Sequence, residues 1–185
     1  MIRRTLFLLC GSVFLIVAVR PARAQEPLPQ ANVRNLRVSV RPDGLWVSYR
    51  VDGAFSPAVL EKLAGSTAVR FIHRVRLVHR RMFGTRTLAE RTIEMTAQYD
   101  NLTRQYSLTR AVDGAEQERT TTESEEEMQR FMTVVGEFRV AGPEAWAGQK
   151  KATVQIRAEY EDTWLLFLFP WSYSAREERD IPLSP

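Results

Sequence analysis

The stretch KATVQIRAEYE, residues 151–161, alternates small or apolar side chains with polar ones at every position. In an extended chain, successive side chains point to opposite faces, so one face collects the apolar set and the other the polar set. Such alternation is typical of a strand with one buried and one solvated face, as in antiparallel sheets. The stretch predicts a β-rich fold with Ala152, Val154, Ile156, Ala158 and Tyr160 facing the core.

The same pattern appears near the start of the chain, where two alternating runs flank a turn sequence. Residues 36–40 and 45–51 alternate, and Arg41-Pro42-Asp43-Gly44 lies between them. Proline presets one backbone dihedral, aspartate closes a local hydrogen bond, and glycine accepts a positive φ. The two runs are therefore predicted to form a hairpin.

Three further strands are expected in the middle of the chain. An arginine-rich run over 68–81 is the longest, and its partner over 87–99 follows a loop near Gly84. A third strand, 104–109, folds back across the turn at 100–103. The expected cross-strand neighbours are Tyr99 with Arg104, Ala97 with Tyr106, Arg76 or Arg80 with Glu90, and Arg74 or Arg76 with Glu94.

Two short helices interrupt the strands. Ser56 is a favourable N-cap, Pro57 suits the first helical position, and Gly65 is expected to end this helix after Leu63. The second helix is expected to begin with Thr122 and Glu125 at capping-box spacing and to end at Gly136. Its apolar stripe at helical spacing is Met128, Phe131, Met132 and Val135.

These elements predict an all-β fold (a β-rich α+β arrangement): a single antiparallel β-sandwich or open barrel of about seven strands with two short helices. The domain is expected to span 33–185 and to carry an aromatic C-terminal tail. Residues 25–32, which contain two prolines, are expected to form a flexible lead-in.

The first 24 residues have the organisation of a signal peptide. Arg3 and Arg4 precede an apolar run over 5–19, and Ala22-Arg23-Ala24 places small residues at the two positions that a signal peptidase reads. Residues 1–24 are therefore predicted to direct export and to be removed near Ala24. The expected location is the periplasm or cell envelope.

Removal of this leader changes the charge balance. The whole chain has 26 Lys and Arg against 22 Asp and Glu, and four of the arginines lie in the leader, so 26 − 4 = 22 basic residues face 22 acidic ones. A near-neutral chain does not suggest nucleic-acid binding. The single cysteine, Cys10, is also in the leader, so no disulfide is expected.

The order of these signatures resembles a known exported bacterial family. The hairpin turn is followed by Phe55-Ser56-Pro57-Ala58 at the start of a short helix, by the arginine-rich strand, and by Tyr99-Asp100-Asn101-Leu102-Thr103-Arg104-Gln105-Tyr106. This order resembles the family described as domain of unknown function 4390, over about 32–161. The resemblance implies the fold and export, and it brings no established activity.

Motifs that carry catalysis or bind cofactors are absent from the sequence. His73 and His79 share a face of one predicted strand about 20 Å apart, too far to bind one metal. The sequence contains neither a Gly-x-Ser-x-Gly elbow nor a Ser-x-x-Lys motif. No catalytic, metal or cofactor residues are predicted, although two of the 22 carboxylates could still meet as a hydrolase pair.

Two surfaces remain as candidates for binding. The first is the arginine stripe of the 68–81 strand, which would bind an acidic partner, anionic lipid or polysaccharide, or would pair with the glutamates of its own hairpin. The second is the uncharged segment Trp164–Trp171, a membrane-interface wedge, a partner contact or a final strand. The candidate residues are Arg70, Arg74, Arg76, Arg80, Trp164, Phe167, Phe169 and Trp171.

The function expected from the sequence is that of an exported, non-catalytic accessory or interaction module with an unknown protein partner in the envelope. One alternative is a peripheral membrane protein that makes membrane-surface contact through Trp164–Trp171. A second alternative is an envelope hydrolase with a carboxylate pair.

Overall fold

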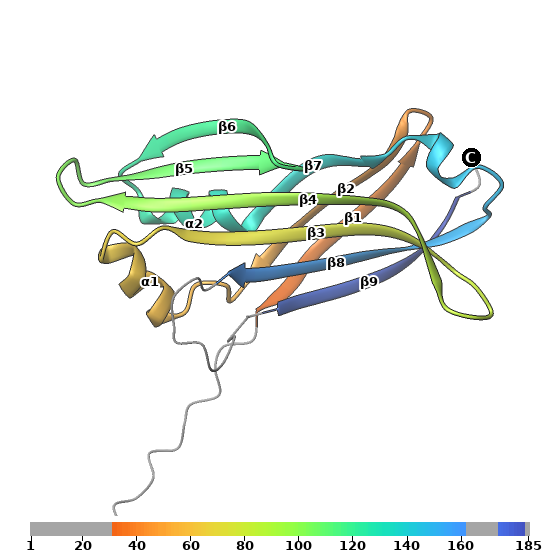
Figure 1. Ribbon diagram of the computed structural model, residues 1–185, viewed down its shortest axis with the longest axis horizontal. Coiled ribbons are helices and arrows are strands. Elements are labelled where there is room, and N and C mark those ends of the chain that lie inside the picture. The colour runs from red at the N-terminus through yellow and green to blue at the C-terminus, as the bar shows by residue number, and fades with distance from the viewer. Residues whose placement is uncertain (1–30, 162–173, 184–185) are drawn as a thin grey trace, which may run out of the picture.

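A computed structural model of the chain describes residues 31–161 and 174–183 (Figure 1). These residues form nine strands, two α-helices and one 3₁₀ turn, so the structure is β-rich with two short helices, as predicted, but has more strands than the expected seven. The elements are β1 (Asn32–Arg41), β2 (Gly44–Asp52), α1 (Pro57–Ala64), β3 (Val69–Arg80), β4 (Thr85–Asp100), β5 (Gln105–Val112), β6 (Ala115–Thr122), α2 (Glu125–Thr133), β7 (Val134–Ala141), η1 (Pro143–Trp146), β8 (Lys151–Glu161) and β9 (Ser174–Pro182).

Several predictions concern parts of the chain outside these ranges. They are the leader over 1–24, nearly all of the lead-in over 25–32, and the aromatic segment Trp164–Trp171. Asn32 was predicted to belong to the lead-in, but it begins β1 because its backbone pairs with Asp52 of β2.

The strands form two antiparallel sheets. The smaller has the order β1-β2-β7, and the larger has the order β6-β5-β4-β3-β8-β9. Strand β1 contacts β9, and β7 contacts β3 and β4, so the smaller sheet covers one face of the larger one (Figure 1). Helix α2 covers the same face beside β4 and β5. Of the two predicted architectures, the structure is the sandwich.

The core lies between the two sheets, and β3 and β8 contribute many of its buried side chains. The bounds of β8 match the predicted 151–161, and Val154 and Ile156 are fully buried, as expected from their alternation. In the β3–β8 register Ile156 faces Val75 and Val154 faces Leu77. The positions between these residues point to the opposite face of the sheet, where most side chains are charged or polar.

The β1–β2 hairpin forms at the predicted turn, and Gly44 is essential to it. Gly44 has φ +155°, and a Cβ atom at this position would lie 2.5 Å from the carbonyl oxygen of Ala141 in β7. A side chain would therefore push β7 away from the hairpin, so the glycine permits both the turn and the close approach of the neighbouring strand.

The β4–β5 hairpin also forms, but its predicted register was wrong by two residues. Tyr99 faces Tyr106 rather than Arg104. The carboxylate of Asp100 accepts hydrogen bonds from the backbone N–H groups of Leu102 and Thr103, and the strand resumes only at Gln105. A shift of two residues preserves the faces, so the apolar side chains still share one side.

Three strands escaped prediction because they lack apolar alternation. Strand β6 is exposed almost throughout, β9 buries little beyond Ala175 and Ile181, and β7 begins directly after α2. Gly136 was expected to end the second helix, but it lies inside β7. A strand that contributes few side chains to the core lacks the alternating apolar pattern from which strands are predicted.

Both predicted helices are present. Helix α1 has Ser56 as its N-cap, and the Ser56 side chain accepts a hydrogen bond from the N–H of Val59. Helix α2 begins later than predicted, because Ser124 rather than Thr122 is its N-cap and accepts from the N–H of Glu127. The Thr122 hydroxyl instead donates to the Glu127 carboxylate.

One polar pair lies inside the core. His73 of β3 is fully buried, and its Nδ1 lies 3.2 Å from the hydroxyl of Tyr49 in β2. Nε2 makes no hydrogen bond of ordinary geometry with any described residue. The other histidine of β3, His79, has its Nδ1 3.2 Å from the Lys151 carbonyl oxygen.

Burial lowers the pKa of His73 from 6.5 to about 4, because the low-polarity core disfavours the charged ring. The positive charge of Arg110 in β5 acts in the same direction, whereas the Met132 backbone at the end of α2 partly opposes the shift. Burial likewise raises the pKa of Tyr49. Both side chains of the pair are therefore neutral near pH 7.

We predict that the free energy of unfolding falls by about 3 kcal/mol between pH 6.5 and pH 4 through His73 alone. In this range the unfolded chain binds a proton that the folded chain does not, so stability rises with pH and levels off above 6.5. Urea unfolding across this range measures the effect. His73→Phe should remove this part of the pH dependence, whereas Tyr49→Phe should keep it; equal slopes in wild type and His73→Phe would contradict the prediction.

Candidate functional site

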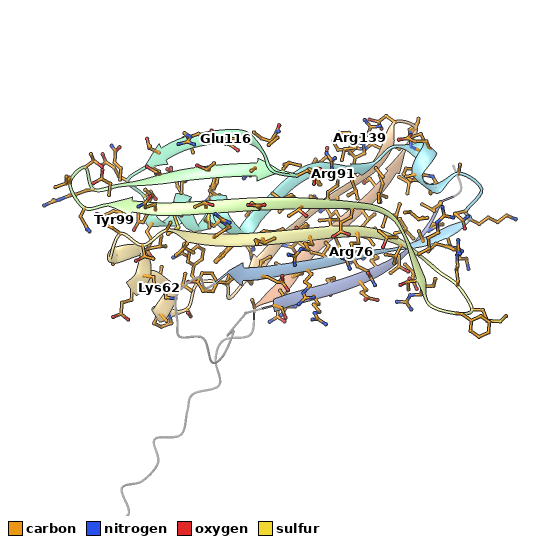
Figure 2. The ribbon with its side chains drawn as sticks, viewed as in Figure 1. Lys62, Arg76, Arg91, Tyr99, Glu116 and Arg139 are labelled. Atoms are coloured by element: carbon orange, nitrogen blue, oxygen red, sulfur yellow. The ribbon has the colours of Figure 1, made fainter. Side chains whose placement is uncertain are left out.

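The four arginines predicted from the β3 strand lie on the outer face of the larger sheet, and each lies near a carboxylate. Figure 2 labels Arg76 among them. The pairs are Arg70–Glu94 at 4.0 Å, Arg74–Glu159 at 2.5 Å, Arg76–Glu90 at 3.1 Å and Arg80–Glu178 at 2.7 Å. These pairs are partly exposed, so each contributes about 0–1 kcal/mol.

The register confirms one of the predicted pairings and corrects the other. Arg76 faces Glu90 directly. Glu94 was expected opposite Arg74 or Arg76, but it faces Ile72, so its nearest arginine is Arg70. Arg74 instead pairs with Glu159 of β8.

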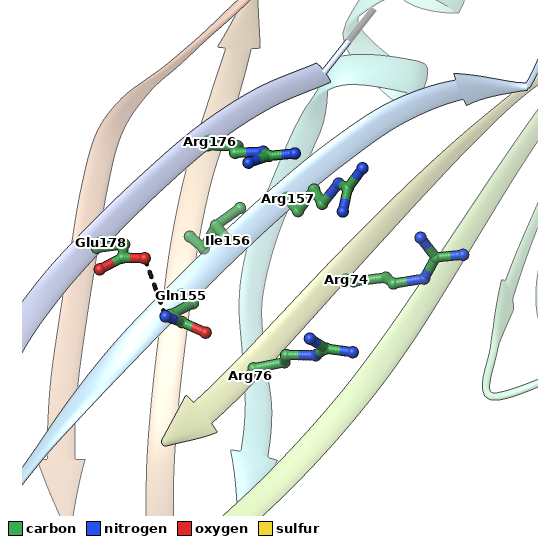
Figure 3. Close-up of a pocket in the computed structure, with 7 residues that line it drawn as sticks. All are labelled: Arg74, Arg76, Gln155, Ile156, Arg157, Arg176 and Glu178. Atoms are coloured by element: carbon green, nitrogen blue, oxygen red, sulfur yellow. Dashed lines mark hydrogen bonds between the residues drawn. The ribbon is translucent and has the colours of Figure 1, made fainter. Parts of the chain in front are cut away.

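A second set of arginines emerges only from the pairing of three strands. Arg74 of β3 faces Arg157 of β8, and Arg157 faces Arg176 of β9. Neighbouring strands lie about 4.8 Å apart, so the three side chains form a continuous row across the sheet (Figure 3). We call Arg74, Arg157 and Arg176 the arginine row.

Carboxylates neutralise this row only in part. Glu159 lies two residues beyond Arg157 on the same face, and its carboxylate pairs with both Arg74 and Arg157. Arg176 has no ion-pair partner in residues 31–161 and 174–183. Two guanidinium groups thus share one carboxylate and the third has none, although like charges in directly opposed positions destabilise a sheet.

The surface beside the row is hollowed. A shallow depression of about 300 Å³ is lined by the three arginines of the row together with Arg76, Gln155 and Glu178. Gln155 donates a hydrogen bond of 2.9 Å to Glu178, which also binds Arg80. Glu178 is therefore already engaged, and four guanidinium groups, Gln155 and Ile156 line the rest of the depression (Figure 3).

The chemistry of the depression is that of anion binding. A guanidinium group presents planar N–H donors that match the two oxygens of a carboxylate or phosphate. It remains protonated at any physiological pH, so it serves as a donor and a positive charge rather than as a proton-transfer group. A depression lined by several such groups suits an extended chain of acidic groups.

Sequence reasoning found Arg74 and Arg76 but missed Arg157 and Arg176. Arg157 was placed correctly on the solvated face of the 151–161 strand, yet nothing in the sequence indicates that it lies beside Arg74. Arg176 belongs to β9, a strand without apolar alternation. The remaining candidates, Trp164, Phe167, Phe169 and Trp171, lie outside the described residues.

The described residues meet the requirements of neither a metal site nor a membrane-spanning helix. Within residues 31–161 and 174–183, no three His, Cys, Asp or Glu side chains are grouped as a metal site would require. In the same ranges, no helix has the length and apolar character needed to cross a membrane.

A family model described as "Domain of unknown function (DUF4390)" matches residues 29–165. No curated protein and no solved structure matches the chain. The matched stretch contains β1 to β8, with Arg74 and Arg157, and it ends before β9, which carries Arg176.

We predict that Arg176→Gln stabilises the folded chain by about 0.2–1 kcal/mol in low salt, because it removes a like-charge contact with Arg157. Salt near 1 M should abolish the gain by screening the repulsion. Chemical unfolding at the two salt concentrations measures it. Arg76→Gln is the matched control and should not stabilise, since Arg76 faces Glu90; equal effects of the two substitutions would refute the repulsion.

Proposed function

The chain belongs to the DUF4390 family, and on this premise we propose that it is an exported bacterial envelope protein that acts as a non-catalytic interaction module. Export is supported by the sequence of the first 24 residues, with two arginines, an apolar run and a small-residue cleavage site. The interaction role is supported by the arginine row, whose partner would be an acidic segment of another envelope protein.

The observation that carries this proposal is the shortage of carboxylates along the row. Elsewhere on β3, arginine and glutamate alternate across strands and neutralise each other, as in Arg76–Glu90 and Arg80–Glu178. At the row, Arg74 and Arg157 share Glu159, whose side chain is only 15% exposed, and Arg176 pairs with no carboxylate of the described residues. An incoming carboxylate would relieve the repulsion among the arginines and form charge-assisted hydrogen bonds.

The depression also suits a protein segment better than a small ligand. It is open to solvent and extends across the neighbouring strands β3, β8 and β9. An extended acidic peptide could therefore lie over it with several carboxylates within reach of the arginines. Affinity from such surface contacts would depend strongly on salt. The row would thus select its partner by charge rather than by burying a large part of the partner's surface.

Binding of a fluorescent poly-glutamate peptide, measured by anisotropy, tests the row. We expect Arg157→Gln with Arg176→Gln to weaken binding about tenfold or more, because charge-assisted hydrogen bonds are lost. The matched control is Arg119→Gln with Arg130→Gln, which removes the same charge from exposed positions on β6 and α2. Equal losses for both variants would show that only net charge matters and would overturn the role of the row.

Export is tested separately by expressing the complete chain in a bacterium and fractionating the cells. We expect the protein in the periplasmic or envelope fraction, with Gln25 as its first residue by N-terminal sequencing. Replacing Leu8 and Leu9 by arginine should retain the precursor in the cytoplasm. An intact wild-type precursor in the cytosol would contradict export while leaving the binding test unaffected.

A further inference from the structure

The loop between β3 and β4 presents two large apolar side chains to solvent. Met82 is 91% exposed and Phe83 is 92% exposed, whereas the apolar side chains of the flanking strands are mostly buried or half-buried. The described residues leave both side chains uncovered, as is typical of a site that contacts a membrane or another molecule.

The backbone holds these side chains at the apex of the hairpin. The N–H of Arg81 donates a 2.9 Å hydrogen bond to the carbonyl of Gly84, which closes the loop with Met82 and Phe83 between them. A break in the register between Leu77 and Val78 marks a bulge near the base of the loop. Figure 1 shows this end of the β3–β4 hairpin curving away from the sheets.

Positive charge surrounds the base of the apex. Arg80, Arg81 and Arg86 flank it, and the sequence contains no acidic residue between Arg80 and Glu90. Lys151 lies beside the hairpin, because its carbonyl contacts His79. Arg81, Arg86 and Lys151 form no ion pair with any residue in 31–161 and 174–183.

Two acidic groups near the base of the hairpin are already engaged. Glu178 binds Arg80, and Asp180 accepts a hydrogen bond of 2.6 Å from the Thr153 hydroxyl. The end of the molecule therefore has an apolar tip, then a ring of mostly unneutralised cations, and then the sheet.

We propose that Met82 and Phe83 insert into the surface of an anionic lipid bilayer, with Arg81, Arg86 and Lys151 at the level of the lipid phosphates. The order of chemical groups along the hairpin matches the order of layers in a membrane interface, apolar beyond anionic. A protein partner fits less well. A stable protein interface needs about 800 Å² on each side, and the apolar part of this tip is two side chains.

This site is distinct from the arginine row. It uses none of the residues of the arginine row, and it does not depend on the proposed acidic partner. Leu102, at the β4–β5 turn, is also exposed, at 94%, but it lies at the opposite end of β4, about 50 Å away, between Asp100 and Arg104. It therefore serves as a matched apolar control.

Flotation of the chain with lipid vesicles tests the proposal. We expect binding to vesicles of phosphatidylcholine mixed with phosphatidylglycerol, little binding to phosphatidylcholine alone, and release by salt. Met82→Ser with Phe83→Ser should weaken binding about tenfold or more. Arg81→Gln with Arg86→Gln should weaken it about fivefold for each charge removed.

The controls separate this tip from other sources of binding. Leu102→Ser, and Arg157→Gln with Arg176→Gln, should both bind the mixed vesicles as the wild type does. All of these positions are exposed, so each variant should fold, and circular dichroism checks that it does. Failure of the wild type to float, or equal flotation of wild type and the Met82, Phe83 variant, would overturn the proposal.

Discussion

The pairing of β3 with β8 is the constraint on which the rest of the structure depends. Their register sets Val75 against Ile156 and Leu77 against Val154 on the face that the smaller sheet covers. The strict period of two then fixes the other face as well, because the intervening positions must point to it. The same register that builds the core thus aligns Arg74 with Arg157, and the β8–β9 pairing adds Arg176.

The outer face consequently has two kinds of charge. Where the register opposes unlike charges, as at Arg76 and Glu90, the side chains neutralise each other and contribute modestly to stability. Where it opposes like charges, the sheet carries a cost that neighbouring carboxylates only partly offset. Glutamate in the middle of the row would neutralise its neighbours, so stability alone does not account for Arg157, whereas the proposed binding role does.

Much of the fold follows from local pattern, and much of the candidate site does not. The strands with apolar alternation, such as 151–161 and 68–81, were predicted nearly to their ends, and Ser56 and Pro57 marked the start of α1. Strands β6, β7 and β9 were missed because tertiary pairing, rather than their own apolar side chains, makes them strands. The arginine row depends on residues far apart in sequence, and register between distant strands has no local signature. Met82 and Phe83 were visible in the sequence, but only the structure shows that nothing in the described chain covers them.

The larger sheet has β6 at one edge and β9 at the other. An edge strand offers unpaired backbone groups to which a second molecule could add a strand, the first step toward fibrils. Both edges here are rich in charge, with AEQERTTT in β6 and SAREERDIP in β9, and Figure 2 labels Glu116 on the first of them. If two copies paired through the same edge strand, charged side chains of both copies would lie close together and lose part of their hydration. The polarity that hid these strands from sequence analysis therefore guards the protein against polymerisation at high local concentration.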